Sequence, residues 1–173
     1  YSVADGAHVY VADERHGFTM SPATNAYLYS AFGTRFVSGL ALDNFIVDGS
    51  GALDSHAQFG NAIGVVAAED IQHTIALRAS TAVRRIFYRR GVGAAWATQG
   101  LAGVITTGSG RAAYNLDTLG TWSLAEVPDG AFVLLHVFAT NGVLLNSDLV
   151  ALLGQASYAT VVAARDAAPG EIS

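Results

Sequence analysis

The chain of 173 residues contains no cysteine and no lysine, and only 13% of its residues are charged. Without cysteine it can form neither disulfides nor zinc–thiolate sites, and it has no thiol nucleophile. Typical soluble domains carry about 25% charged residues. Low charge in a chain that is 51% hydrophobic indicates that much of its surface is buried against neighbours, because contiguous apolar surface usually marks an interface. The alternative is a compact, mildly polar monomer.

Long hydrophobic runs are also missing, and none reaches the ~18–20 residues of a membrane span. The N-terminus lacks the pattern of a signal peptide. The 9 basic residues are all arginine and stand against 14 acidic residues, for a net charge of −5. An acidic chain disfavours general nucleic-acid binding, which needs a net basic face. Because Tyr1 stands in place of a starting methionine, we expect a processed, trimmed or partial chain.

Short strand patterns, separated by turn sequences, run through most of the chain after an irregular N-terminal stretch. Residues 72–78 alternate in polarity, as a half-buried strand does. Residues 112–117 and 121–127 alternate as well, and Thr118-Leu119-Gly120 between them has the length of a hairpin connection. We predict further strands at 7–12, 35–38, 44–47, 61–67, 83–90, 131–139 and 149–153.

Residues 131–139, AFVLLHVFA, are apolar on both faces and lie between the turn sequences Pro128-Asp129-Gly130 and Asn141-Gly142. They predict a buried strand, in which His136 is a core histidine bonded to the backbone. Ser157 can cap a short helix over 158–167, and Pro169-Gly170 can end it.

These patterns predict an all-β protein: an antiparallel β-sandwich, jelly-roll-like, with one short C-terminal helix. No helix alternates with the strands, which disfavours a parallel α/β fold. We divide the chain into residues 1–68, a strand- and loop-rich region for attachment or part of the same sandwich, and residues 69–173, a C-terminal β-sandwich module.

No catalytic motif occurs with the spacing that its chemistry needs. The histidines have no zinc-motif spacing. Gly108-Ser109-Gly110 is not a nucleophile elbow, and Gly91-Val92-Gly93 lacks the third glycine of a dinucleotide fingerprint. Glu69 with Asp70, and Glu126, are acids that a glycan depolymerase could use, but acids beside turns are ordinarily solvated. We therefore predict no catalytic, cofactor-binding or metal-binding residue, with a depolymerase as the alternative.

The unusual charge feature is a cluster of four arginines that brackets Ile86-Phe87-Tyr88. On a strand, Arg85 and Arg89 share a face with Phe87, and Arg84 and Arg90 lie on the other. Arginine beside aromatics suits carboxylate, phosphate or sugar contacts. Contacts to acids and carbonyls within or between subunits are favoured here, because the chain has excess acid. The candidate contact residues are Arg84, Arg85, Arg89, Arg90, Tyr88 and Trp96; a sugar-binding groove lined by Trp96, Tyr88 or Tyr10 is the alternative.

Five runs stand out in the C-terminal half: RRIFYRRGVGAAW at 84–96, RAAYN at 111–115, HVFATNG at 136–142, LVALLGQASY at 149–158 and the ending AARDAAPGEI. Together they resemble a β-rich module of bacteriophage structural proteins, near the distal end of fibres, spikes or head-decoration proteins. In that module a strand ending in F-A-T-N leads by a turn to a strand ending in G-Q, and a short helix follows. The resemblance covers about residues 84–172, and Gly142 stands where such sequences often carry Asp.

The resemblance implies a non-enzymatic virion structural protein on the surface of an extracellular particle. It implies a homotrimer that attaches to other capsid or tail proteins or contacts a host surface glycan. It implies no cofactor, no nucleic acid and no membrane insertion. Residues 1–68 carry no resemblance.

Overall fold

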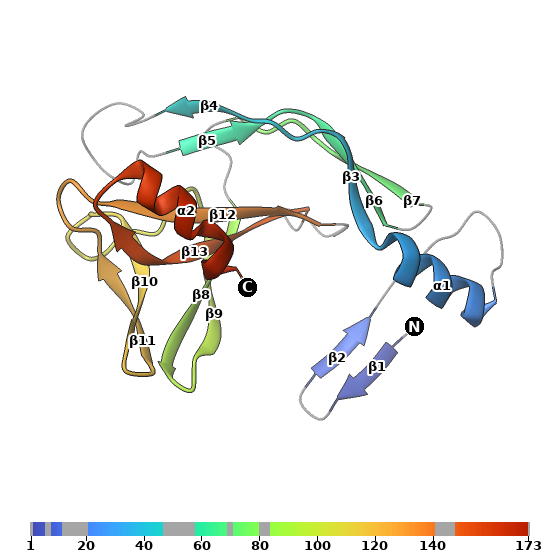
Figure 1. Cartoon of the computed structure of the whole chain (residues 1–173), viewed down its shortest axis with the longest axis horizontal. Coiled ribbons are helices and arrows are strands. Elements are labelled where there is room, and N and C mark those ends of the chain that lie inside the picture. Colours follow the sequence, from blue (N-terminus) through green and yellow to red (C-terminus); the bar gives the residue numbers. More distant parts are fainter. Residues whose placement is uncertain are drawn as a thin grey trace.

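The computed structural model describes residues 2–5, 8–11, 21–46, 58–68, 71–79, 84–140 and 148–172, which form thirteen strands and two helices (Figure 1). A long, narrow N-terminal part extends away from a β-rich C-terminal part. Residues 84–172 are called the module below. Neither helix in the described part of the chain is long and apolar enough to cross a membrane.

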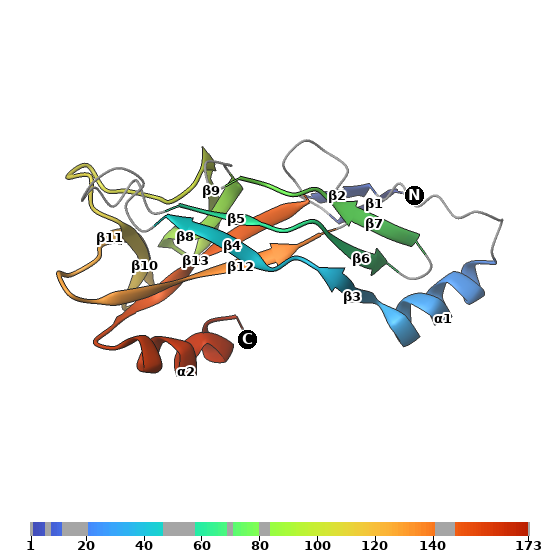
Figure 2. The same cartoon turned by 90° about the horizontal axis from the view of Figure 1, so that it is seen from above.

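The N-terminal part is built from three small sheets and one helix. β1 (Ser2–Asp5) and β2 (His8–Val11) form an antiparallel hairpin, and β4 (Leu42–Ile46) pairs with β5 (Gln58–Asn61). Helix α1 (Pro22–Phe32) leads into β3 (Thr34–Gly39), which pairs with β6 (Gly64–Ala68), which pairs in turn with β7 (Ile71–Ile75). We call α1, β3, β6 and β7 the arm; it runs along one side of the molecule to the far end (Figure 2).

The module has six strands and one helix. Its sheet has the order β10-β11-β8-β13-β12, with β9 paired to β8. All its pairings are antiparallel except β8 with β13, which run parallel. The elements are β8 (Arg84–Val92), β9 (Ala95–Ala102), β10 (Ala113–Thr118), β11 (Thr121–Glu126), β12 (Phe132–Ala139), β13 (Leu149–Tyr158) and α2 (Val161–Glu171).

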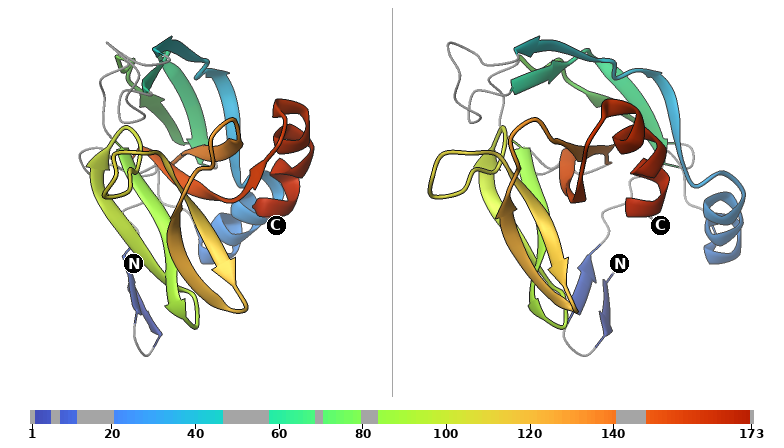
Figure 3. Two further views of the ribbon diagram at one scale, coloured as in Figure 1. Left: turned by 90° about the vertical axis from the view of Figure 1, so that its left-hand side faces the viewer. Right: turned by 60° about the vertical axis from the view of Figure 1, so that its left-hand side comes forward.

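Strand β8 takes part in three pairings, and this folds the sheet over itself. It pairs with β13 at Arg85–Phe87 but with β11 only at Gly91–Val92. The β10–β11 hairpin therefore joins at the end of β8 and turns back, so that β10 packs against β13. Figure 3 shows the β8–β9 hairpin and the β10–β11 hairpin side by side, with α2 on the opposite side of the module. The core between the layers consists of Ile86, Ile105, Ala113, Ala151 and Leu153.

A second apolar cluster joins the base of the arm to the module. Val66 and Ile75 of the arm are 4% and 1% exposed, and they pack with Leu149 at the start of β13. Strands β6 and β7 lie on either side of the proposed boundary after residue 68, and they pair with each other over five residues of each strand. The arm is thus anchored to the module at one end.

The predicted all-β class with a short C-terminal helix is confirmed, and most pairings are antiparallel as expected. The parallel β8–β13 pair was not expected, and the jelly-roll connectivity stays a prediction. The tight turn at Leu119-Gly120 is confirmed, since Thr118 pairs with Thr121 and both turn residues have positive φ. The turn at Asn141-Gly142 lies outside the described residues.

Three elements were missed. Strand β1 lies before the first predicted strand, which was placed at 7–12. Helix α1 falls in a stretch predicted to be irregular. Ser21 Oγ accepts the Thr24 amide at 3.1 Å, and Pro22 occupies the first helical position, a favoured N-terminal combination. Strand β9 was not predicted because AWATQGLA has no clear alternation; its pairing with β8 holds it. The single strand expected at 61–67 is two strands, β5 and β6, separated by Ala62 and Ile63.

The C-terminal helix begins and ends later than predicted. Ser157 does not cap it, because Ser157 pairs with Val133 in the β12–β13 ladder. The cap is Thr160, whose side chain accepts the Ala163 amide at 3.1 Å. Pro169 lies inside the helix, which continues to Glu171.

Strand β12 is less buried than its sequence suggested, and it is irregular. The register shifts between Val133 and Leu135, where three residues of β13 stand opposite Leu134. A Cβ atom on Gly154 would lie 2.4 Å from the Leu134 carbonyl oxygen, so only glycine fits this close approach.

Replacing Gly154 by Ala should therefore lower the free energy of unfolding by about 1–3 kcal/mol, the usual cost of overpacking. Urea denaturation followed by circular dichroism measures it. The control is Gly108→Ala, because a Cβ there would meet nothing within 4 Å; it should change stability by less than about 0.5 kcal/mol. Equal effects of the two substitutions would contradict the close approach.

Candidate interaction surface

The first arginine of the predicted cluster, Arg84, fastens the N-terminal part to the module. Its side chain is buried, with 1% of the residue exposed. Nη2 donates a hydrogen bond to the Phe59 carbonyl oxygen at 2.9 Å, and the guanidinium lies 4.1 Å from the centre of the Phe59 ring. Burial, and then the positive charge of Arg78, lowers the pKa of Arg84. Arg84 thus makes a carbonyl contact within the chain, one of the two arrangements predicted for the cluster.

Arg89 lies between two tryptophans. Its guanidinium carbon is 5.0 Å from the ring centre of Trp96 and 5.2 Å from that of Trp122, within the range of cation–π attraction. The buried Asn115 fixes the backbone here: its Oδ1 accepts the Arg89 amide at 2.6 Å, and its Nδ2 donates to the Arg89 carbonyl at 2.8 Å. Sequence reasoning missed Trp122 and Asn115, because only the folded-over hairpin brings them to β8.

The other candidates divide between surface and core. Arg85 and Arg90 are exposed. Tyr88 packs against the core cluster around Ile86, so it is not an exposed platform for a sugar. The side chain of Tyr10 lies outside the described part of the structure. Trp96, which is 55% exposed, is the exposed aromatic of the set.

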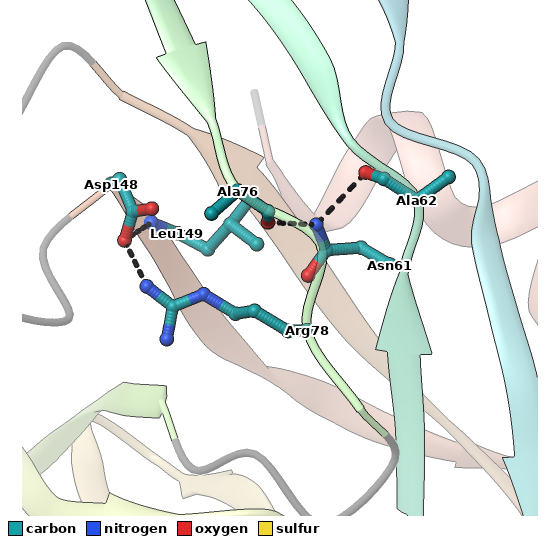
Figure 4. Close-up of polar contacts among 6 residues, drawn as sticks. All are labelled: Asn61, Ala62, Ala76, Arg78, Asp148 and Leu149. Carbon is teal, nitrogen blue, oxygen red and sulfur yellow. Dashed lines mark hydrogen bonds and ion pairs between the residues drawn. The ribbon is translucent and has the colours of Figure 1, made fainter.

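A polar joint holds β5 and the end of the arm to the start of β13 (Figure 4). The buried Asn61 donates from Nδ2 to the carbonyls of Ala62 at 3.0 Å and Ala76 at 3.1 Å. Its backbone exchanges two hydrogen bonds with Arg78, both 3.0 Å. The Arg78 guanidinium pairs with the carboxylate of Asp148, whose side chain is 22% exposed. No local sequence pattern predicts this joint, because its members are far apart in the chain.

The C-terminal helix is held by Glu171. Its carboxylate lies 3.0 Å from Nε2 of His136, accepts the Gln155 amide at 2.9 Å, and accepts the Tyr158 hydroxyl at 2.6 Å. The side chains of His136 and Glu171 are 10% and 7% exposed. The prediction that His136 bonds to backbone is wrong, because the end of α2 brings a carboxylate to it. Burial, followed by the bond and the charge of Glu171, raises the pKa of Tyr158 to about 12.

An open apolar groove of about 440 Å³ lies on the outer face of the module's sheet. Side chains alternate along a strand, so Phe87 and Leu152 face away from the core that Ile86 and Ala151 face. Phe138 lies on the same side of β12 as His136, which binds α2. The helix therefore covers one end of this face and leaves the other open. The groove is lined by Phe87, Trp96, Phe138, Val150, Ala151 and Leu152.

A second uncovered apolar surface lies on the arm. Strand β3 is exposed along its whole length. In α1, Tyr27 is 67% and Phe32 is 53% exposed; in β3, Phe36 is 66% and Val37 is 41% exposed. Helix α1 has no charged residue. Four large apolar side chains in eleven consecutive residues are thus open to water.

Of the acids considered for catalysis, Glu126 is the one in the described part of the chain. Glu126 accepts hydrogen bonds from the hydroxyls of Thr107, at 3.2 Å, and Ser109 on an exposed loop. Glu69 and Asp70 lie outside the described residues. Within the described ranges, no group of three histidines or acids could hold a metal ion.

Arg85 and Arg89 form a matched pair, since both lie on the outer face of β8 but only Arg89 is stacked on tryptophan. Arg89→Gln should lower the free energy of unfolding by about 1–2 kcal/mol, because it removes two partly exposed cation–π contacts. Arg85→Gln should change it by less than about 0.5 kcal/mol. Urea denaturation monitored by tryptophan fluorescence tests this. Similar losses in both variants would mean that the stacking contributes nothing.

The raised pKa of Tyr158 makes stability depend on pH in the alkaline range. The folded chain holds this proton more tightly than the unfolded chain, whose tyrosine pKa is about 10. The resulting stability is fully present below pH about 10 and is lost as pH rises through about 12. In the Tyr158→Phe variant, the free energy of unfolding should decrease less over this pH range. Urea denaturation at a series of pH values measures it. Tyr27→Phe, at an exposed position, is the control, and an unaltered pH profile in Tyr158→Phe would contradict the contact.

The chain matches no protein-family model, no curated protein and no solved structure in the three comparisons with known proteins.

Proposed function

We propose that this chain is a non-enzymatic structural protein that assembles with copies of itself on the surface of a bacteriophage particle, as a fibre, spike or capsid-decoration component. The observation that carries the self-assembly is the exposed arm. Its outer end projects from the module (Figure 1) and presents to water an uncharged helix, with Tyr27 and Phe32, and a strand with Phe36 and Val37.

Such an arm is not stable by itself. Helix α1 has 11 residues, and isolated helices shorter than ~12–15 residues are marginal in water. Most helical stability in proteins comes from packing an apolar face, and α1 is largely exposed, with Tyr27 and Phe32 both more than half so. Contiguous apolar surface of this kind marks an interface. A neighbouring subunit that covers the arm accounts for its conformation.

The placement in a virion rests on the resemblance of about residues 84–172 to the distal module of phage fibres, spikes and decoration proteins. In such particles many identical chains pack by symmetry, so apolar surface left open on one copy is buried between copies. The resemblance favours a homotrimer. The polar joint holds the end of the arm to the module, and Arg84 holds β5 beside it, as an arm that reaches a neighbour requires.

A sugar-binding role is the second candidate, and the exposed Trp96 is the observation that favours it. An aromatic face stacks well on a sugar ring, but specific sites also place a few polar groups around the ligand. The groove beside Trp96 is lined by apolar side chains. This lining favours an apolar protein partner over a glycan.

The proposal predicts a closed symmetric oligomer of the 17.9 kDa chain, with three copies favoured, in sedimentation or native mass spectrometry. Tyr27→Ser combined with Phe32→Ser should shift the population toward monomer. Leu119→Ser is the control, because Leu119 is fully exposed on the β10–β11 turn.

A monomer at all concentrations would overturn the assembly. Release of reducing ends from host polysaccharide, lost in Glu126→Gln, would replace the structural role with a depolymerase. Antibodies against the chain should label intact phage particles, and particles that lack the chain would refute the virion role.

A further inference from the structure

The described part of the chain presents two uncovered apolar surfaces, and they lie far apart. One is the outer end of the arm, with Tyr27 and Phe32 on α1; the other is the groove beside Trp96 and Phe138. Figures 1 and 2 both place α1 at the end of the molecule away from β8 and β9. An arm anchored at its base to Leu149 cannot fold back onto its own groove without breaking that anchor.

We propose that the groove of one copy receives helix α1 of a neighbouring copy. This inference rests on the proposed self-assembly and names the two surfaces that meet. The face already carries one helix: α2 contacts β12 and β13, bound through Glu171 to His136, two residues from Phe138. A second helix beside α2 would complete the helical layer over the sheet, as a helix laid in a hydrophobic groove does.

The chemistry of the two surfaces matches. At 3.6 residues per turn, Tyr27, Leu28, Ala31 and Phe32 fall within one face of α1, and the helix carries no charge that would be buried on docking. The groove lining is apolar as well. Arg85, which is exposed, and Arg89 lie on the same face of β8 as Phe87 and border the groove. The docked helix must leave their guanidinium groups in contact with water, because burying an unpaired charge is costly.

The area is adequate for a specific contact. Aromatic side chains bury about 150–250 Å² each, so covering the open halves of Tyr27, Phe32, Trp96 and Phe138 removes roughly 400 Å² of aromatic surface from water. A specific interface needs about 1,000 Å² in all. The rest would come from the helix backbone, its smaller side chains and the strands that border the groove.

The contact has a consequence for symmetry. Because the arm of one copy and the groove of the next are different surfaces, the contact is heterologous and closes into a ring when the rotation allows. A three-membered ring gives the trimer, with each copy donating one arm and receiving another. Each subunit's arm is then stabilised only in the assembly.

A double-mutant cycle on the full chain tests the pairing. Phe32→Ser on the arm and Phe138→Ser in the groove should each raise the dissociation constant of the oligomer about tenfold or more, as anchor residues do. Together they should cost little more than either alone, because both remove one contact. Leu119→Ser is the control and should leave the constant within about twofold.

The absence of cysteine allows a second test by cross-linking. Chains carrying Ala31→Cys in α1 are co-expressed with size-tagged chains carrying Thr98→Cys, which pairs with Phe87 beside the groove. A short bis-maleimide should link the two. Asp129→Cys, on the exposed turn before β12, is the control acceptor and should not be linked.

The outcomes separate this inference from the proposed function. An oligomer in which the two serine substitutions act independently, and in which Thr98→Cys is linked no better than Asp129→Cys, overturns the groove pairing and leaves self-assembly standing. A chain that is monomeric throughout overturns both. Coupled substitutions with a selective cross-link support the pairing.

Discussion

The parallel pairing of β8 with β13 is the constraint on which the module depends. Parallel neighbours need a long crossover connection, and here that crossover contains β9, β10, β11 and β12. Strand β8 pairs with β9 along most of the length of β8, but it pairs with β11 only at the end of β8. The remaining hairpin must therefore fold over the sheet, which buries Ile86 against Ala151 and Leu153 on one face. The opposite face is left for α2 and the open groove.

Charge is scarce in this chain, and several charged groups lie where segments meet. Arg84 and Arg78 hold the N-terminal part to the module, and Glu171 holds α2 to β12 and β13. A buried charge is costly unless its partners are in place. Such contacts therefore specify one arrangement of the segments more than they add stability. The apolar clusters supply the stabilisation, and the polar contacts decide which segment lies where.

The two ends of the arm differ in how well their apolar side chains are covered. At the base, Val66 and Ile75 bind the module in a small closed core. Farther out, α1 and β3 expose aromatic side chains that no described segment of the chain covers. A protein built to act alone would bury such residues or replace them with polar ones, because exposed apolar patches promote association. This division suits a subunit whose final structure is completed by its neighbours.

The sequence by itself determined the local elements. Alternating polarity located β7, β10 and β11, and the Gly-containing turn at Leu119-Gly120 followed from the need for positive φ. Alternation also placed Arg85 and Arg89 opposite Arg84. Low charge predicts buried surface between chains, and this stays a prediction. These features depend on residues close together in the sequence, so sequence patterns are enough to predict them.

The tertiary structure decided everything that joins distant segments. Strand β9 has no pattern of its own and exists because β8 pairs with it. Trp122 reaches Arg89 only because the β10–β11 hairpin folds back. His136 meets a carboxylate rather than backbone because β13 extends to Tyr158 and carries α2 back over it. Which apolar residues stay open, as Trp96 and Phe138 do, depends on where α2 ends. Local patterns specify strands and turns, whereas long-range pairing specifies which faces are covered.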